Sequence, residues 1–175
     1  WAVTRHAEAR GRGYKRVQVE PHLSVTGGCS AEWVPIRPKT DPAFMFALMY
    51  VLLIEHPISE LDVPFMRDRT SSPYLVGPDG LYLRDAASKK PLLWDETANK
   101  AVPYDTPGVV PALIGRFRVS GAVSVDADEA CKALGDVEGI TAFSKLVEHI
   151  EKYSPEWAGK ICDVPAATIR RIANE

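Results

Sequence analysis

The sequence is poor in metal ligands. Its 175 residues include only three cysteines and four histidines, with no CxxC pair and no histidine within four residues of another histidine or of a cysteine. This spacing excludes the zinc and iron–sulfur motifs that can be recognised from sequence, and an odd number of cysteines gives no self-contained set of disulfides. We therefore predict that Cys29, Cys131 and Cys162 are buried free thiols.

The sequence also lacks common catalytic motifs and any excess of charge. It contains no GxSxG, P-loop, GxGxxG or HExxH motif. A net charge of −2 with 25% charged residues gives no field that attracts nucleic acid or an anionic membrane surface, so neither is expected as a partner. The longest apolar run, residues 43–54, is shorter than the roughly 20 residues that span a bilayer, which predicts a buried helix and no membrane insertion. No secretory signal is visible.

The first part of the chain has the pattern of an α/β protein. The expected elements are an exposed helix over residues 1–12, short strands over 14–20 and 31–36, and a buried helix over 41–56. A Ser/Thr/Gly-rich stretch between the two strands predicts a loop, and Pro35 suits an edge strand. A strand, a loop, a strand and a buried helix within about 45 residues indicate a layered α/β architecture.

The pattern is less regular beyond residue 56. The expected elements are a short helix over 60–70, two strands joined by a turn at 77–80, an irregular excursion over 89–121, a short helix over 126–134, and helices over 141–153, 154–161 and 165–175. The excursion contains four of the fourteen prolines and no sustained period. A chain of this length suits one domain, in which the last third is helical.

Acidic residues follow both predicted strands of the first part. Glu20 ends the first strand, and Asp41 follows the second and opens a helix. Ligands of open α/β sheets lie beyond the carboxyl ends of the strands, where an acid accepts hydrogen bonds from both hydroxyls of a ribose. A carboxylate at Asp41 can accept two parallel N–H bonds from guanine. Two alternatives stay open: a solvated strand end at Glu20, and a helix cap at Asp41.

A hydrolase is a further alternative. His22 lies near Glu20 and Ser24 in the sequence, but alternation along an extended chain points these side chains in different directions. A hydrolytic site would need His22 or His149 paired with a nucleophile.

Two segments carry a resemblance to a known family. They are VQVEPHLSVTGGCSAEWVPIRPKTDPAFMFALMYVLL, residues 17–53, and YSPEWAGKICDVPAATIRRIANE, residues 153–175. The first resembles a valine-rich strand ending in Asp-Pro and a PIRPGTD motif leading into an apolar helix. The second is similar to Thr-Pro-Glu-Trp-Ala followed by a Val-Pro-x-x-Thr-Ile-x-x-Ala helix. Both patterns are typical of catalytic subunits of molybdopterin oxidoreductases of the dimethyl sulfoxide reductase type.

The resemblance implies a Rossmann-like layered sheet-and-helix domain that holds the guanosine end of a molybdopterin guanine dinucleotide. It implies that the cofactor-binding residues are Glu20 and Pro21 at the ribose, Arg37, Pro38, Thr40 and Asp41 at the guanine, and Ser24 and Thr26 as secondary loop contacts. This sequence departs from the family pattern with Glu20 for the usual aspartate, His22 for a common arginine and Lys39 for a glycine. A lysine costs backbone freedom if position 39 requires a positive φ.

The resemblance also implies a division of the chain and a larger context. We expect a Rossmann-like dinucleotide-holding part over residues 1–70, an irregular insertion with a hairpin over 71–121, and a helical part of the same domain over 122–175. The molybdenum ligand and a [4Fe-4S] cluster of the parent subunit would lie outside these residues, so the chain carries no catalytic residue and is not expected to be active alone.

The implied partners are an iron–sulfur electron-transfer subunit, together with the rest of the catalytic subunit. The implied source is bacterial, and the sequence does not distinguish a cytoplasmic from a periplasmic location. We expect the chain to expose apolar surface and to be an internal piece of a longer subunit. The alternative from a different class is a non-catalytic α/β binding or interaction domain.

Overall fold

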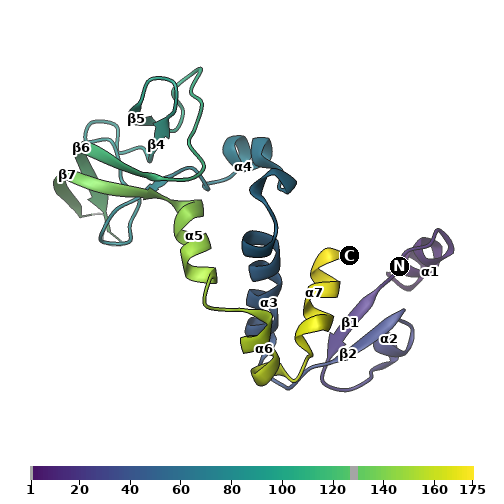
Figure 1. Ribbon diagram of the computed structural model, residues 1–175. Helices are drawn as coiled ribbons and strands as arrows, with labels where there is room; N and C mark the ends of the chain where they lie inside the picture. The colour runs from purple at the N-terminus through teal and green to yellow at the C-terminus, as the bar shows by residue number, and fades with distance from the viewer. Residues whose placement is uncertain (1, 127–129) are drawn as a thin grey trace. The chain divides into compact units, whose positions relative to one another are not determined.

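A computed structural model describes residues 2–126 and 130–175 of the chain (Figure 1). The chain forms two compact units. Unit 1 comprises Trp1–Glu55 and Ile150–Glu175, and unit 2 comprises His56–His149. Both units mix helices with small sheets, so the α/β class is confirmed.

Unit 1 contains one parallel pair of strands and several helices. Its elements are α1 (Ala2–Gly11), β1 (Val17–Glu20), α2 (Val25–Gly28), β2 (Glu32–Pro35), α3 (Asp41–Tyr50), the π-helical turn η1 (Val51–Glu55), α6 (Pro155–Cys162) and α7 (Ala166–Asn174). Strands β1 and β2 pair in parallel, with Val17 opposite Glu32 and Glu20 opposite Pro35. Among the described residues β2 pairs only with β1, so the prediction that Pro35 lies in an edge strand is confirmed.

The connection between β1 and β2 is not the predicted loop. It contains α2, a helix of a single turn. Ser24 caps this helix, because its side-chain oxygen accepts a hydrogen bond from the Gly27 N–H at 3.1 Å. The Ser/Thr/Gly composition that suggested a loop thus supplies a helix cap.

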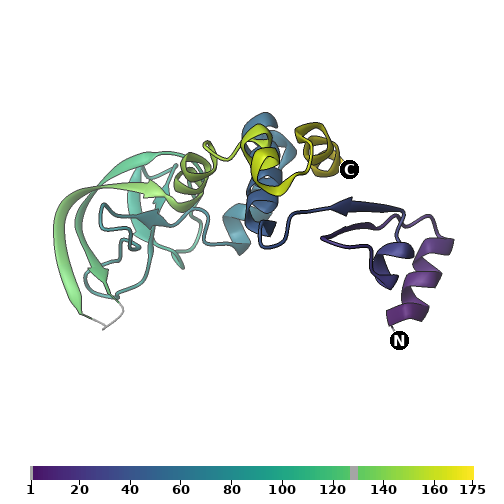
Figure 2. The same ribbon diagram turned by 90° about the horizontal axis from the view of Figure 1, so that it is seen from below.

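The core of unit 1 joins the strand pair to three helices. Helix α3 packs against α6 and α7, and the three lie side by side in both Figure 1 and Figure 2. Val34 of β2, Phe44 of α3 and Ile169 of α7 belong to this core. The predicted burial of α3 on almost all sides is wrong, because Met45 is 55% exposed. One side of the helix faces the core, and Met45 lies outside it.

Unit 2 is built on antiparallel strands. Its elements are the 3₁₀ turn η2 (Ile58–Glu60), α4 (Val63–Arg69), β3 (Leu75–Val76), β4 (Leu92–Asp95), β5 (Lys100–Pro103), β6 (Arg116–Val125), β7 (Cys131–Thr141) and α5 (Ala142–Ile150), whose last residue belongs to unit 1. One sheet has the order β3-β7-β6, and β4 and β5 form a separate hairpin. The predicted turn at residues 77–80 is present, because the Gly80 N–H donates to the Gly77 carbonyl at 3.1 Å.

Two predictions in unit 2 are wrong. Residues 89–121 are not an irregular excursion, because they contain β4, β5 and the first part of β6. Their side chains form a core in which the rings of Trp94 and Phe117 stack at 4.6 Å. The helix predicted over 126–134 is also wrong where the structure describes it. Cys131 begins β7 and pairs with Val125, and residues 127–129 lie outside the described residues. Pairing with β6 overrides the local helix preference, so the last third is not helical throughout.

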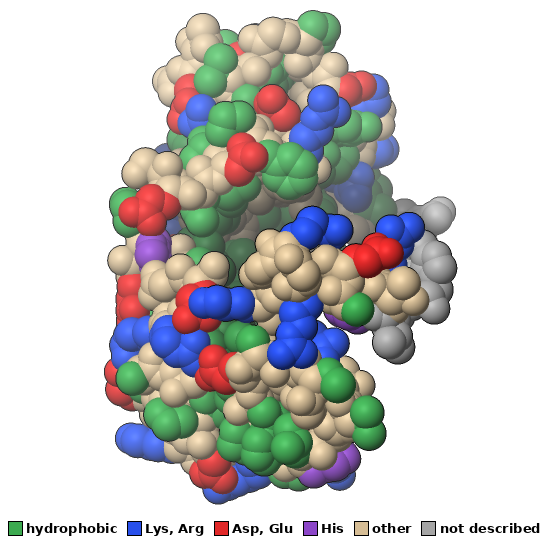
Figure 3. Space-filling model, turned by 90° about the vertical axis from the view of Figure 1, so that its right-hand side faces the viewer, with side chains coloured by type: hydrophobic (Ala, Val, Ile, Leu, Met, Phe, Trp, Pro, Cys, Tyr) green, Lys and Arg blue, Asp and Glu red, His purple; other side chains and the backbone are tan. Residues whose placement is uncertain are grey.

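The predictions of α1, β1, β2, α4, α5, α6 and α7 are confirmed. The prediction of buried thiols holds for Cys162 alone, because Cys29 and Cys131 are exposed. No helix within the described ranges has the length and apolar character needed to cross a membrane. On the face drawn in Figure 3, acidic and basic side chains are interspersed, and neither sign dominates it.

Candidate functional site

The Glu20 carboxylate is fixed at the carboxyl end of β1 by the loop that follows it. The backbone N–H of Ser24 donates to Glu20 Oε1 at 2.8 Å. The Ser24 hydroxyl lies 2.8 Å from Oε1 and 2.9 Å from Oε2, and its single proton can serve only one of them. The indole N–H of Trp33 donates to the Glu20 carbonyl oxygen at 3.0 Å, which ties the strand end to β2.

These contacts also set the ionisation of Glu20. The backbone N–H of Ser24 is the largest cause that holds the pKa of Glu20 below its ordinary value, followed by the Ser24 hydroxyl. The positive charge of His22 acts in the same direction with a smaller effect. Hydrogen bonds to the charged form favour that form, so Glu20 is a carboxylate at neutral pH.

Gly27 makes room for this carboxylate. A Cβ atom built at position 27 would lie 2.2 Å from Glu20 Oε1, which no real contact allows. The second glycine of the sequence Thr-Gly-Gly-Cys, Gly28, has open space around the same position. The sequence prediction missed Gly27, and two adjacent glycines were the only signal for it.

Residues 37–40 form a tight turn before α3. The Thr40 N–H donates to the Arg37 carbonyl oxygen at 3.3 Å, and the Thr40 hydroxyl donates to the same oxygen at 2.6 Å. Lys39 has a φ of 67°, the backbone conformation that favours glycine. Position 39 therefore has the positive φ at which a lysine is expected to cost backbone freedom. Proline followed by a residue of positive φ is the pattern of a type II turn.

Asp41 is the first residue of α3, and its side chain is exposed. The cap position belongs to Thr40, whose side chain makes no capping hydrogen bond. Within the described part of the chain, the Asp41 carboxylate has no hydrogen bond or ion pair. The interpretation of Asp41 as the cap of its own helix is therefore wrong for this structure.

Arg37 is held by a residue far away in the sequence. Its Nε and Nη2 atoms donate to the two carboxylate oxygens of Asp163, each at 3.0 Å, and its backbone N–H donates to the Cys162 carbonyl oxygen at 3.0 Å. Asp163 ends α6 with a φ of 62°. This contact fixes the turn before α3 to the end of α6, and sequence reasoning did not predict it.

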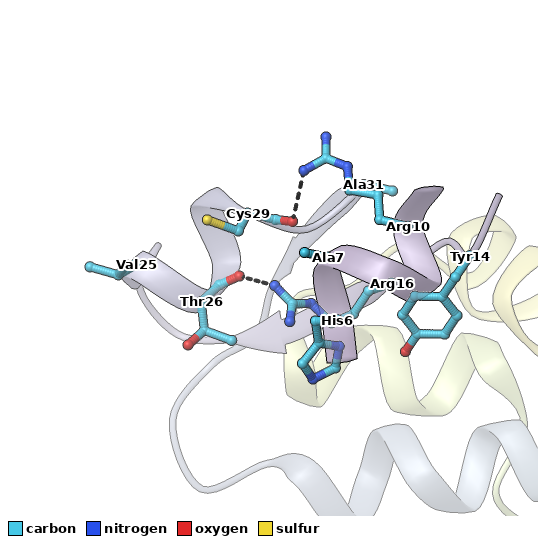
Figure 4. A pocket seen from close by; sticks show the side chains of 9 residues that line it. All are labelled: His6, Ala7, Arg10, Tyr14, Arg16, Val25, Thr26, Cys29 and Ala31. Carbon is cyan, nitrogen blue, oxygen red and sulfur yellow. Dashed lines mark hydrogen bonds between the residues drawn. The ribbon is translucent and has the colours of Figure 1, made fainter. Parts of the chain in front are cut away.

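The structure brings some of the predicted site residues together and separates others. Glu20 and Ser24 form one hydrogen-bonded group, and Arg37, Pro38 and Thr40 form the turn that leads to Asp41. Pro21 lies in an exposed bend after β1. Thr26 has no hydrogen bond to Glu20 in the described part of the chain. It lines a cavity to which Glu20 does not contribute, and its carbonyl oxygen accepts a hydrogen bond from Arg16 there (Figure 4).

His22 belongs to unit 1 and His149 to unit 2. Across the described ranges, no three His, Cys, Asp or Glu side chains are grouped so that they could hold a metal ion.

Comparison with known proteins shows what the chain is similar to. No family model matches it. It is 30% identical to a sulfite dehydrogenase subunit of Allochromatium vinosum, over 97% of this chain and 17% of that protein. It is also 30% identical to a putative dimethyl sulfoxide reductase catalytic subunit of Halobacterium salinarum, over 95% of this chain and 19% of that protein. Dimethyl sulfoxide reductase DmsA of Haemophilus influenzae is 28% identical over 97% of this chain and 14% of that protein.

These similarities extend over nearly the whole chain, well beyond the two segments that carried the resemblance. The chain belongs to the dimethyl sulfoxide reductase family of molybdopterin oxidoreductases. It spans less than a fifth of the length of each of these three relatives.

Proposed function

We propose that the chain is part of the catalytic subunit of a molybdenum oxidoreductase and that unit 1 holds the guanosine end of a molybdopterin guanine dinucleotide. In this proposal the strand pair and its helices are one part of a Rossmann-like layered domain. Glu20 receives the ribose hydroxyls and Asp41 reads the guanine base. Pro21, Ser24, Arg37, Pro38 and Thr40 shape or line the site, whereas Thr26 lines a separate cavity and is left out of it.

The observation that carries the proposal is the position of two carboxylates. Glu20 ends β1, and Asp41 follows the turn after its parallel neighbour β2. The carboxyl ends of parallel strands lie at the same edge of a sheet, which is where α/β proteins bind nucleotides. Both carboxylates therefore belong to the edge at which a dinucleotide is expected.

The Glu20 carboxylate suits a ribose. Oε1 accepts from the Ser24 N–H at 2.8 Å, and the Ser24 hydroxyl donates its proton to either Oε1 or Oε2. The contact of Oε2 with the Gln18 side-chain amide is long, at 3.4 Å. A carboxylate oxygen accepts about two hydrogen bonds, so Oε2 keeps capacity for a hydroxyl donor. Ser24 holds the group in place before a ligand arrives, which lowers the ordering cost of binding.

The Asp41 carboxylate suits a guanine. Its two oxygens have no partner among the described residues, and guanine presents two parallel N–H donors, N1–H and N2–H, at matching spacing. Adenine lacks this pair of donors. The rigid turn with Pro38 and the Arg37–Asp163 pair fix the backbone from which Asp41 projects.

The residues present therefore fit the guanosine end of the cofactor. When bound, the cofactor would supply molybdenum as the centre that exchanges two electrons with a substrate. The chain's own residues would orient the nucleotide and take no part in that exchange. Two of the three relatives are named as subunits, one of them as catalytic. These names support the further proposal that the whole protein works with partner subunits, including one that transfers electrons through iron–sulfur clusters.

The experiment compares nucleotide binding by the chain and by its Asp41→Asn variant. We expect GMP to bind more tightly than AMP in calorimetric titration. Asp41→Asn should weaken GMP binding by roughly tenfold or more, because one acceptor oxygen becomes an N–H₂ donor that faces the guanine donors. AMP binding should not change.

Asp68→Asn is the matched control, because Asp68 is an exposed residue of α4 in unit 2 with no role in the proposed site. It should leave GMP binding unchanged. Equal affinities for GMP and AMP, or equal losses in the two variants, would contradict the proposal. Circular dichroism of both variants would show whether the fold is intact.

A further inference from the structure

Unit 1 contains a second candidate site at the opposite ends of its strands. A cavity of about 570 Å³ lies between α1 and α2 (Figure 4). Arg16 and Ala31, which line it, directly precede β1 and β2. The carboxyl ends of these strands are four residues further along, about 13 Å away at ~3.3 Å per residue. The cavity is therefore separate from the proposed guanosine site, and its volume is in the range of small-molecule sites.

The lining of the cavity is basic. His6 and Arg10 lie four residues apart on the same side of α1, and Arg16 approaches from the start of β1 (Figure 4). None of the nine lining residues is acidic. Two guanidinium groups and an imidazole therefore share this cavity without a carboxylate among the side chains that line it.

These two arginines have no carboxylate partner among the described residues. Arg37, Arg116 and Arg170 each form ion pairs with carboxylates. Among the described residues, Arg10 and Arg16 instead donate only to carbonyl oxygens. Arg16 donates to Thr26, and Arg10 donates to Cys29 at a long 3.5 Å, as the dashed lines in Figure 4 show.

The Arg16 side chain is held in place but not fully satisfied. Its Nε atom is buried and has no hydrogen-bond partner. A guanidinium offers five N–H donors in a planar fork, and the Thr26 carbonyl oxygen accepts from only one of its nitrogens. Charge and donor capacity therefore remain for an anion that enters the cavity.

The remaining walls are largely apolar. Ala7, Val25 and Ala31 line the cavity, and the ring of Tyr14 lies 6.2 Å from the ring of His6 at an angle of 34°. Val25 is 88% exposed, although a valine side chain gains free energy when it is covered. These walls suit an apolar or aromatic group attached to the anion.

We propose that this cavity binds a phosphate monoester that carries a small apolar or aromatic group. A phosphate monoester has a charge of about −1.5 to −2 at pH 7, which matches the two guanidinium charges better than a carboxylate does. Its three terminal oxygens accept from both guanidinium groups and from the His6 imidazole, and its organic group lies against Tyr14.

Calorimetric titration of the chain with phenyl phosphate tests this inference. We expect saturable binding that is tighter than that of inorganic phosphate, which lacks the ring, and tighter than that of benzoate, which lacks the second charge. Arg10→Gln should weaken binding of phenyl phosphate by roughly tenfold, since it removes a charged donor. Arg16→Lys keeps one charge and loses the planar fork, and it should weaken binding as well.

Arg12→Gln is the matched control. Arg12 is exposed, directly follows α1 and does not line the cavity, so its replacement should leave the affinity unchanged. Phenyl phosphate that fails to bind, binds no more tightly than inorganic phosphate or benzoate, or is weakened equally by Arg10→Gln and Arg12→Gln would overturn the inference. The Asp41→Asn variant tests whether phenyl phosphate binds in this cavity or at the proposed guanosine site. It should leave phenyl phosphate binding unchanged, and a loss would place the ligand at the strand ends instead.

Discussion

The turn before α3 allows a prediction with a worked magnitude. Lys39 has a φ of 67°, and this left-handed conformation costs a residue with a side chain about 1–2 kcal/mol. Glycine avoids that cost, but its extra conformational freedom in the unfolded chain destabilises the folded state by about 0.5–1 kcal/mol. We therefore expect Lys39→Gly to increase the free energy of unfolding by about 0.5–1 kcal/mol.

Thermal unfolding of unit 1 measures this change. Unit 1 contains about 80 residues, for which 1 kcal/mol shifts the melting temperature by about 4–8 °C, so Lys39→Gly should raise it by about 2–8 °C. Lys39→Ala is the control, because it removes the same side chain but keeps a Cβ atom and its steric cost. An equal rise for alanine and glycine, or no rise for glycine, would refute the reasoning from φ.

Two further predictions concern carboxylates of unit 1. Gly27→Ala should push the Glu20 carboxylate away from Ser24, because the new Cβ would lie 2.2 Å from Oε1, and the pKa of Glu20 should rise toward its ordinary value. NMR titration measures this pKa, and an unchanged value would contradict the geometry. Arg170 lowers the pKa of Glu156 from 4.5 to about 2, so the pair stabilises the fold above about pH 4.5 and this stability is lost as the pH falls toward 2. Because the Glu156 side chain is 57% exposed, Glu156→Gln should lower the free energy of unfolding by only about 0.5–1 kcal/mol at pH 7, and should not change it near pH 2. Urea unfolding at both pH values measures this difference. An equal loss at the two pH values would contradict the proposed role of the pair.

The parts of the fold that could be predicted have strong local signals. Pro42 at the first turn of α3, the Ser154-Pro155 start of α6 and the apolar spacing of α5 each specify a helix within a few residues. Residues 89–134 have no such signal. Strands β6 and β7 depend on pairing partners far apart in the sequence, as in the pairing of Arg116 with Ile140, and local propensity does not reveal such pairs.

In the candidate site, too, residues with a local sequence signal could be predicted and long-range contacts could not. Glu20 and Asp41 could be predicted at the ends of β1 and β2, because strand ends are visible in the sequence. The groups that position the turn before Asp41 could not be predicted. Asp163 lies 126 residues from Arg37, and no pattern in either segment indicates that their side chains meet. Contacts of this range depend on how α6 packs against α3, which only the fold determines.

The short segment before α3 holds two local costs to stability. Lys39 occupies a conformation that disfavours lysine, and the Thr40 hydroxyl donates to Arg37 and does not cap the helix. A helix without a side-chain cap gives up about 1 kcal/mol. Costs of this kind persist in native proteins mainly where a site requires them. Both lie within two residues of Asp41, the carboxylate assigned to guanine. If Lys39→Gly stabilises unit 1 and leaves GMP binding unchanged, the strain at Lys39 is not needed for the site. If the variant stabilises unit 1 and weakens GMP binding, the lysine takes part in holding the nucleotide.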